Sequence, residues 1–487
     1  MRIYSYLRKR GRGAFCARPS RFHDNLLTVG LWVLAAWCAQ TVWAQEIKKD
    51  VTSFDAMLAP SQTAASGETS APVTLTFKDA LERAQHNYAQ YLSAVTDAKN
   101  AHEDRLQARA AMLPSIGYTQ QYLGTQGNGK TPNGRYVTND GVHVYRVWGV
   151  FHQDLPAGFF TASSYKRADA GVALAEAKAE IARRGLAVTV TKNYYGLIVA
   201  ERRYAIAQQA LDQAQRFVEI STLLEKRGET AHSDVVKAQF QLNQQKLAFK
   251  EAQLGKDNAR LALAVLLSPT LDENFAAVDD IDAAPGLPPL PEVKAMAERQ
   301  NQDIRDASEA LRQSKADVTI ARAGFFPTLS FDADYGLEAN ALALHAPIAA
   351  DPQKGKLPSL GYFITASLNF PVWNWGITRS KLHQAQYRRQ QAQAELTQAQ
   401  REALSNLYSF YNEAAAARAE AATLHEAADL AAESSRLTTL RYQAGEATVL
   451  EVVDAQNSLT TARGAFNDGQ VRYRVALATL QTLTGSF

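Results

Sequence analysis

Apolar and polar residues alternate strictly in two stretches of the second half of the chain. In residues 329–337 every odd-numbered side chain is apolar or aromatic, and the positions between them are Ser, Asp, Asp and Gly. In residues 361–370 the even-numbered side chains are apolar or aromatic. A period of two predicts strands with one apolar face. Weaker alternation predicts two further strands, at about 115–123 and 143–155.

The rest of the chain is patterned mainly as helix. Residues 157–227 and 376–441 contain no proline and are rich in strong helix formers, so they predict two helices of about 100 Å. The helix after each of them carries apolar residues in the 3-4 spacing of a coiled-coil seam. The seam residues are Val235, Ala238, Leu242, Phe249, Ala252, Ala259 and Leu266, and then Val449, Val452, Leu459, Ala462, Phe466, Tyr473, Leu477 and Leu480. Two more single helices are expected at about 75–112 and 291–324.

Landmarks in the first half recur in the second half at nearly constant distances. Pro114 and Pro327 are 213 residues apart, Pro156 and Pro371 are 215 apart, and Gly228 and Gly445 are 217 apart. We therefore predict an internal duplication, with repeats at 75–284 and 285–487. Each repeat has the order helix, strand, strand, long helix, turn, helix.

The N-terminal residues 1–44 are predicted to be a signal peptide. Seven basic residues precede an apolar run at 26–38, and Val42-Trp43-Ala44 offers a small-residue cleavage pattern. The alternative is a retained membrane anchor, although the run is shorter than the about 20 residues of a spanning helix. Residues 45–74 are rich in Ser, Thr and Ala and predict a flexible leader.

The predicted signal peptide also accounts for the basic character and the cysteines of the chain. The full sequence has a net charge of +3, but residues 1–44 hold seven basic residues and one acid, which leaves −3 for the remainder. No nucleic-acid partner is therefore expected. Cys16 and Cys38 both lie in the signal, so no disulfide is expected, and Trp37 before Cys38 disfavours a lipoprotein.

Candidate functional residues follow a predicted turn at Gly445. Glu451 and Asp454 are three residues apart and share one face of the helix that leaves this turn. A weaker copy of the segment surrounds Gly228, where Lys237 takes the place of Asp454. The alternative is that both carboxylates are solvated charges near a helix N-terminus, where the helix dipole favours them.

The predicted strands have the length of a tilted membrane crossing. A transmembrane β-strand needs about 9–11 residues, and an open sheet edge is not tolerated in lipid. Single-chain barrels need at least about eight strands, so four strands per chain must be pooled between copies. Three copies would supply twelve strands. The alternative is a soluble four-stranded antiparallel sheet.

The chain resembles the TolC family, the outer-membrane efflux and secretion ducts of Gram-negative bacteria. The resemblance covers residues 75–485 and rests on the repeated plan, the helix-to-strand prolines and two motifs. The motifs are Phe370-Pro371-Val372-Trp373-Asn374-Trp375-Gly376, and a terminal signature of Arg441-Tyr442, Gly445, Leu450-Glu451-Val452-Val453-Asp454-Ala455-Gln456, Leu459, Ala462-Arg463, Leu480 and Leu483-Thr484-Gly485.

The resemblance implies a mostly α-helical fold with a membrane β-barrel. In such a homotrimer, a twelve-stranded barrel in the outer-membrane lipid continues into a long periplasmic helical barrel. A periplasmic adaptor and an inner-membrane pump, proton-driven or ATP-driven, would dock at its tip. The alternative is a periplasmic coiled-coil adaptor, which would carry one hairpin rather than two. The cargo is not indicated by the sequence.

The resemblance also implies roles for single residues at the tip. Glu451 and Asp454 correspond to acids that ring the closed aperture and favour cations. Tyr442 is similar to a tyrosine that ties neighbouring coils in the closed state, and its partner corresponds to Asp234. The family's prototype has an arginine where this chain has Ala447. The alternative is that Tyr442 only packs in the coil and Asp234 is an ordinary acid of a first helical turn.

Nothing in the sequence predicts an enzyme, a cofactor or a metal site. Residues 124–131 match the phosphate-binding pattern G-x-x-x-x-G-K-T, but that motif opens a helix, and here Pro132 follows directly. We interpret the segment as a surface loop. The histidines show no metal-ligand spacing, and no Ser/His/Asp set or paired catalytic carboxylates are recognisable.

Overall fold

The computed structural model describes most of the chain between Val73 and Gly485. The described residues are 73–124, 143–155, 161–269, 275–339, 344–345 and 358–485. The predicted signal peptide, the leader up to residue 72, and the loop with the phosphate-binding pattern from residue 125 onward lie outside the described residues.

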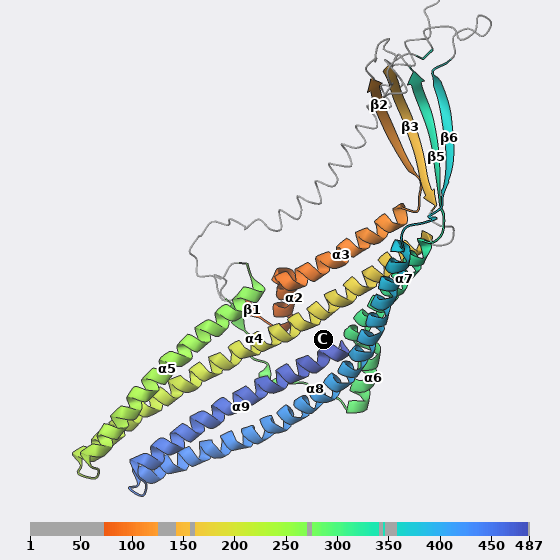
Figure 1. Ribbon diagram of the computed structural model, residues 1–487. Helices are drawn as coiled ribbons and strands as arrows, with labels where there is room; N and C mark the ends of the chain where they lie inside the picture. Colours follow the sequence, from red (N-terminus) through yellow and green to blue (C-terminus); the bar gives the residue numbers. More distant parts are fainter. Residues whose placement is uncertain are drawn as a thin grey trace, which may run out of the picture. The chain divides into compact units, whose positions relative to one another are not determined.

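Four antiparallel strands form one open sheet (Figure 1). In spatial order they are β2 (Ser115–Gly124), β3 (His143–Leu155), β5 (Thr328–Ala339) and β6 (Leu360–Asn369). Their bounds differ by at most two residues from those that the alternation predicts. Among the described residues, no strand pairs with the outer edge of β2 or of β6.

The register places the apolar faces of all four strands on the same side of the sheet. One row across the sheet is Ile116, Phe151, Ala333 and Ile364, and the next row is Tyr118, Gly149, Tyr335 and Tyr362. Because side chains alternate along a strand, the Asp, Glu and Arg residues of the four strands all belong to the opposite face. They are Arg146, Asp154, Asp332, Asp334 and Glu338.

Ion pairs and one aromatic contact order this polar face. Arg146 pairs with Glu338 at 2.9 Å, and His152 Nδ1 lies 2.5 Å from an oxygen of Asp332. The indole of Trp148 donates to the carbonyl of Leu337 at 3.0 Å and lies over Gly336. A Cβ at Gly336 would come within 2.0 Å of the carbonyl oxygen of Val147 and 2.8 Å of the Trp148 indole, so only glycine fits at this position.

Beyond the sheet, four helices form two hairpins that lie side by side. Each hairpin combines a long helix, α4 (Thr161–Lys226) or α8 (Ile377–Gln443), with a shorter one, α5 (His232–Leu267) or α9 (Val449–Thr484). The lateral order is α5–α4–α9–α8, because α4 packs against both α5 and α9, and α9 packs against both α4 and α8 (Figure 1). The 66 residues of α4 correspond to about 99 Å of helix, which separates the sheet from the hairpin turns.

The two single helices expected at 75–112 and 291–324 are each broken in two. The first consists of α2 (Phe77–Asn87) and α3 (Ala89–Ala110), and the second of α6 (Leu290–Gln300) and α7 (Gln302–Ala323). Tyr88 and Asn301 interrupt them with extended ψ angles of 109° and 117°. The prediction of unbroken helices was wrong because neither break carries proline or glycine, and tertiary packing overrides the local propensity.

The sequence also did not predict a small parallel sheet in the middle of the chain. Val73–Leu75 (β1) pairs with Phe275–Ala277 (β4), so ordered structure begins inside the expected leader. A short 3₁₀-helix, η2 (Ile281–Ala283), follows β4. Tyr194 of α4 donates from its hydroxyl to the carbonyls of Leu75 (3.0 Å) and Val278 (2.8 Å), which ties α4 to this sheet.

The largest hydrophobic core lies where α4 crosses α2, the end of α5 and the β1–β4 sheet. Its fully buried members include Leu75, Leu186, Val190, Tyr194, Leu197, Ile198 and Leu263. Burial raises the pKa of Tyr194 to about 12, so its hydroxyl remains a hydrogen-bond donor.

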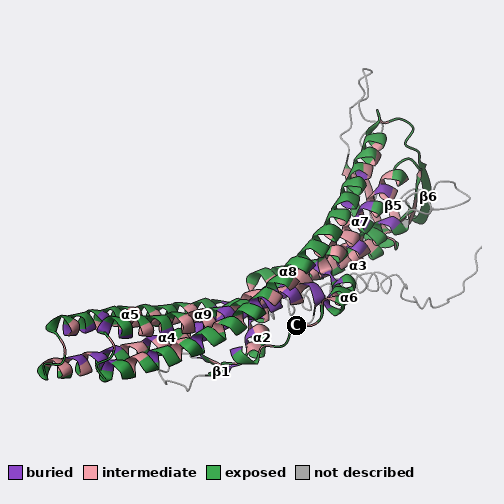
Figure 2. Ribbon diagram, turned by 90° about the horizontal axis from the view of Figure 1, so that it is seen from below, coloured by how far each residue is buried: buried purple, intermediate pink, exposed green. Residues whose placement is uncertain are grey.

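Elsewhere, fully buried residues follow narrow seams along the helices, and the rest of their surface is half-buried or exposed (Figure 2). The seam predicted for α9 is buried at Val449, Val452, Leu459, Tyr473, Leu477 and Leu480. Among the described residues, no helix is both long and apolar enough to cross a membrane.

Candidate functional site

The turn of the second hairpin joins α8 to α9 at Gly445. Gly445 has a φ of +80°, a left-handed conformation that glycine adopts without steric cost. The N–H of Glu446 donates to the carbonyl of Arg441 at 2.8 Å, and the N–H of Gly445 donates to that of Tyr442 at 3.0 Å. These two bonds make a Schellman motif, which closes the end of α8.

The turn of the first hairpin has the same backbone. Gly228 has a φ of +76°, and its N–H donates to the carbonyl of Glu225 at 2.9 Å. The N–H of Glu229 donates to the carbonyl of Leu224, also at 2.9 Å. The chain therefore reverses through the same motif at both tips.

The helix after the second turn begins with a complete capping box. The hydroxyl of Thr448 accepts from the N–H of Glu451 at 3.3 Å, and the carboxylate of Glu451 accepts from the N–H of Thr448 at 3.2 Å. Each side chain thus satisfies a backbone donor of the other residue.

The first turn lacks this cap because two residues are exchanged. The second turn reads Gly-Glu-Ala-Thr at 445–448, and the first reads Gly-Glu-Thr-Ala at 228–231. Ala231 is therefore the N-cap of α5 and offers no side-chain bond. The hydroxyl of Thr230 is buried without a hydrogen-bond partner in the described part of the chain.

Glu451 is engaged by its own turn. Its second carboxylate oxygen lies 3.7 Å from Arg441, which also donates to the carbonyl of Glu446 at 3.1 Å. The bond from the N–H of Thr448 holds the pKa of Glu451 below its ordinary value, and the Thr448 hydroxyl and the charge of Arg441 add to this effect. Glu451 is therefore a cap as well as a charge.

Asp454 is arranged differently. Its side chain is exposed, and within the described part of the chain it makes no hydrogen bond or ion pair. At the equivalent position of the first hairpin, Lys237 pairs with Asp234 at 3.5 Å. One chain therefore brings Glu451 and Asp454 together on α9 and contributes no matching acid pair from α5.

Tyr442 ties the end of α8 to α4. It is only 5% exposed, its ring centroid lies 5.1 Å from that of Phe217, and its hydroxyl lies 3.2 Å from that of Ser221. It forms a small buried cluster with Phe217, Ala238, Val449 and Val452, which come from α4, α5 and α9.

Tyr442 and Asp234 also line one cavity of about 610 Å³ between the two turns. They are not hydrogen-bonded to each other, because the Tyr442 hydroxyl faces Ser221 and the Asp234 carboxylate pairs with Lys237. Ala447 lines the same cavity and packs on the buried cluster.

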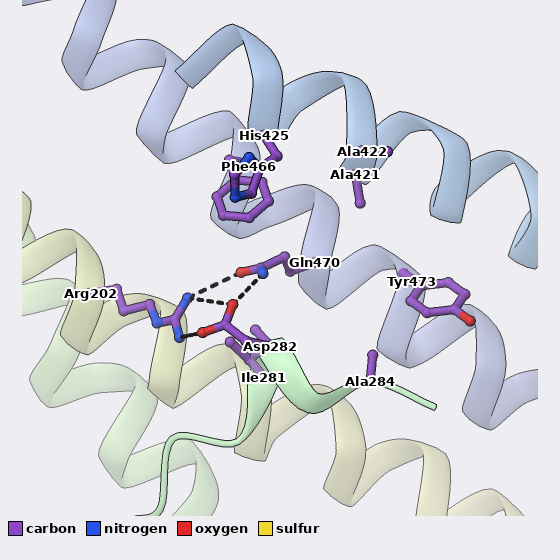
Figure 3. A pocket seen from close by; sticks show the side chains of 10 residues that line it. All are labelled: Arg202, Ile281, Asp282, Ala284, Ala421, Ala422, His425, Phe466, Gln470 and Tyr473. Carbon is purple, nitrogen blue, oxygen red and sulfur yellow. Dashed lines mark hydrogen bonds and ion pairs between the residues drawn. The ribbon is translucent and has the colours of Figure 1, made fainter. Parts of the chain in front are cut away.

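A second cavity, of about 860 Å³, lies between η2, α4, α8 and α9 (Figure 3). Arg202 of α4 donates to Asp279 (2.6 Å), to Asp282 (2.6 Å) and to Gln470 of α9 (3.1 Å) at its edge. Gln470 in turn donates to Asp282 at 2.6 Å. The hydrogen bond from Arg202 holds the pKa of Asp282 below its ordinary value, and the bond from Gln470 adds to this effect. This network leaves its charges paired, so we interpret it as a structural clamp.

The described residues contain no group of three or more His, Cys, Asp or Glu side chains arranged to hold a metal ion.

The family model described as outer membrane efflux protein matches residues 78–268 and 294–486. The chain belongs to this family. The resemblance to TolC is confirmed, and the chain is an outer-membrane protein.

Several known proteins match the chain with low identity. The outer membrane protein OprJ of Pseudomonas aeruginosa is 28% identical over 61% of this chain and 57% of its own length. The cobalt-zinc-cadmium resistance protein CzcC of Cupriavidus metallidurans is 26% identical over 60% of this chain and 65% of its length. The outer membrane protein TolC of Vibrio cholerae is 22% identical over 83% of this chain and 89% of its length. The matches to OprJ and CzcC thus span less than two thirds of those relatives.

Solved channels of this kind share the fold. The outer-membrane channel OprN superimposes with a TM-score of 0.71 at 19% identity, covering 84% of this chain and 90% of its own. The CmeC outer membrane channel of Campylobacter jejuni gives 0.72 at 18% identity, with coverages of 87% and 90%. The assignment of an outer-membrane channel fold rests on these matches.

Sequence reasoning missed three residues of the second tip. Thr448 could have been recognised, because Thr448 and Glu451 have the spacing of a capping box. Phe217 and Ser221 could not, because their contact with Tyr442 joins parts of the chain more than 220 residues apart.

Proposed function

We propose that this chain forms a homotrimeric exit duct in the outer membrane. The observation that carries the proposal is the open four-stranded sheet, whose β2 and β6 edges have no described partner. An isolated sheet with exposed backbone edges is not stable in lipid, whereas three copies would close a twelve-stranded barrel.

The two faces of the sheet fit opposite environments. The face without Asp, Glu or Arg exposes large side chains, with Ile116 83% and Tyr362 79% accessible in the single chain. This face would contact lipid, and the charged face would line an aqueous lumen. The strands of 10 to 13 residues are long enough for a tilted crossing.

The helical layer also has unpartnered edges. The outer helices α5 and α8 expose more large apolar side chains than the inner helices α4 and α9, where only Leu223 and Leu450 among the described residues do so. On α5 the exposed residues are Val236, Phe240, Leu247, Leu254, Leu261 and Val265, and on α8 they include Leu404, Tyr408, Leu430 and Leu437. A ring in which α5 of one copy packs on α8 of the next would bury both edges.

An internal duplication accounts for this arrangement. The order helix, helix, strand, strand, long helix, helix occurs from α2 to α5 and again from α6 to α9. The breaks at Tyr88 and Asn301 are 213 residues apart, the same separation as that of Pro114 and Pro327. We therefore assign the repeats to residues 75–284 and 285–487.

The tips form the gate in this proposal. Three copies of Glu451 and Asp454 around a common axis would concentrate negative potential and favour cations. Tyr442 holds α8 against α4. Asp234 belongs to no capping box, and it is the partner of Tyr442 in the closed state. Ala447 stands where the family's prototype has an arginine. In this proposal the contact between Arg441 and Glu451 takes over part of that arginine's role in closing the gate.

The expected partners are a periplasmic adaptor and an inner-membrane pump. The chain carries two helical hairpins and a sheet, which disfavours the alternative that it is itself a single-hairpin adaptor. The relatives' names range from a metal resistance protein to an alkaline protease secretion protein, so similarity does not assign the cargo. We propose that the partner proteins, not this chain, determine the cargo and the class of pump.

Two measurements test the duct. Native mass determination of the detergent-extracted complex should give the mass of three copies, and a monomer would refute the barrel.

In planar bilayers, Glu451→Gln with Asp454→Asn should raise single-channel conductance and weaken cation preference, because glutamine can still serve the capping box while the charge is gone. The matched control is Glu395→Gln with Glu402→Gln, two exposed acids of α8 far from the tip. Unchanged traces in the tip variant would contradict the gate.

A further inference from the structure

A third cavity lies above the second turn, between α4, α8 and α9. Its volume is about 440 Å³, within the range of small-molecule sites. Each helix supplies one continuous face to it. Among the lining residues are Arg216 and Phe217 of α4, Arg436 and Leu440 of α8, and Leu459 and Arg463 of α9.

The lining is basic and contains no carboxylate. Arg216 makes no hydrogen bond or ion pair within the described part of the chain. Arg463 donates only to the neutral Gln209, at 3.3 Å. Arg436 is neutralised by Glu433 through two bonds of 2.7 and 2.8 Å. Two guanidiniums, one on α4 and one on α9, therefore remain available at the cavity.

The floor of the cavity is apolar. Phe217 and Leu459 form it but are only 3% and 7% exposed, so Leu440, which is 50% exposed, supplies most of the apolar surface within reach of a ligand. The side-chain amides of Gln213, Gln443 and Gln456 add neutral hydrogen-bond donors at the rim. An apolar floor beside unpaired guanidiniums suits a ligand with a flat apolar body and one anionic group.

We propose that this cavity binds amphiphilic organic anions, such as aromatic sulfonates or carboxylates. The apolar body covers the floor, and the anionic group accepts charge-assisted hydrogen bonds from Arg216 and Arg463. Because α4, α8 and α9 all contribute, the bound anion bridges the helices that meet at Tyr442. The site is independent of the acids on α9 and of any export activity.

Calorimetric titration of the detergent-extracted full chain with 2-naphthalenesulfonate tests this site. We expect one binding event per chain that weakens with added salt. The double variant Arg216→Gln with Arg463→Gln should weaken binding by about tenfold or more, since both charge-assisted bonds are lost. The control pair Arg388→Gln with Arg389→Gln, two exposed arginines at the other end of α8, should leave it unchanged.

Two further comparisons separate charge from hydrophobic binding. The neutral 2-naphthalenesulfonamide should bind about tenfold more weakly than the sulfonate, and Leu440→Ser should weaken both ligands. Micelle partitioning is common to all protein variants and cancels between them. The two ligands partition differently, so their affinities are compared at free ligand concentrations measured by dialysis against protein-free micelles. Equal binding by the double variant, equal affinity of the two ligands, or no binding at millimolar sulfonate would each overturn the proposal.

Discussion

The two hairpin tips share a backbone and differ in how the next helix begins. Gly228 and Gly445 close Schellman motifs with the same pair of hydrogen bonds. After Gly-Glu, the second tip continues with Ala447-Thr448 and the first with Thr230-Ala231. Thr448 gives α9 a capping box, whereas Ala231 leaves α5 without one. The comparison shows that the turn is set by backbone geometry, whereas side-chain order decides what the following acid does.

That acid has different neighbours at the two tips. Glu451 is held by Thr448 and approached by Arg441, so much of its hydrogen-bonding capacity is used locally. Asp234 sits at the same helical position, but without a cap its carboxylate contacts only Lys237 in the described part of the chain. The acid at this helical position is therefore an ion-pair partner at the first tip and a helix cap at the second.

The largest difference between the tips should come from Tyr442, which has no aromatic counterpart in the first hairpin. Tyr442→Ala removes a buried ring beside Phe217 and should lower the free energy of local opening at the second tip by about 3 kcal/mol. Amide hydrogen exchange around Gly445 and Gly228 measures both openings. The control Tyr442→Phe loses only the contact with Ser221 and should cost about 1 kcal/mol. Equal loosening of the two tips by Tyr442→Ala would show that the cluster is not specific to the second.

Replacing each turn glycine should affect the tips alike. A Cβ at Gly228 or at Gly445 would meet no atom within 4 Å, so the cost of Gly→Ala is that of a left-handed alanine, about 1–2 kcal/mol. Hydrogen exchange at the ends of α4 and α8 should report similar losses. Clearly unequal losses would mean that the two Schellman motifs are not energetically equivalent.

Exchanging the caps should transfer stability from one tip to the other. Thr448→Ala should destabilise the first turn of α9 by about 1 kcal/mol. Thr230→Ala with Ala231→Thr gives the first tip the order of the second and removes a buried unpaired hydroxyl, so α5 should gain a similar amount. Protection of the first-turn amides is the measurement. No gain in α5 would show that Asp234 cannot replace the longer Glu451 in a capping box.

The smallest expected effect is a loss of stability of the second tip at acid pH. The pKa of Glu451 lies below its ordinary value of 4.5, so the stability it contributes is present above that value and is lost as pH falls through the lowered pKa. Protection of the first turn of α9 should therefore decline below about pH 4.5 in the wild type. Glu451→Gln should remove this decline, and a decline that persists in the variant would assign it to another group.

Local sequence patterns predicted the strands and the turns because these depend on neighbouring residues. Alternation at 329–337 shows an apolar face on one strand, and Gly445 marks a left-handed position. The breaks at Tyr88 and Asn301 carry no such mark, since either residue is acceptable inside a helix and only the packing requires the extended angle.

By itself, the sequence determined the type of each strand and long helix, the places of the turns and the resemblance to outer-membrane ducts. Only the tertiary structure decided that four apolar faces coincide, because strand pairing joins residues up to about 190 positions apart. It also decided that Tyr442 packs on Phe217 and Ser221. In the same way, it placed Arg216 and Arg463 at a cavity with an apolar floor, where neither arginine is paired with an acid. These features depend on which helices lie side by side, and that arrangement is stabilised by burial over the whole chain rather than by any local pattern.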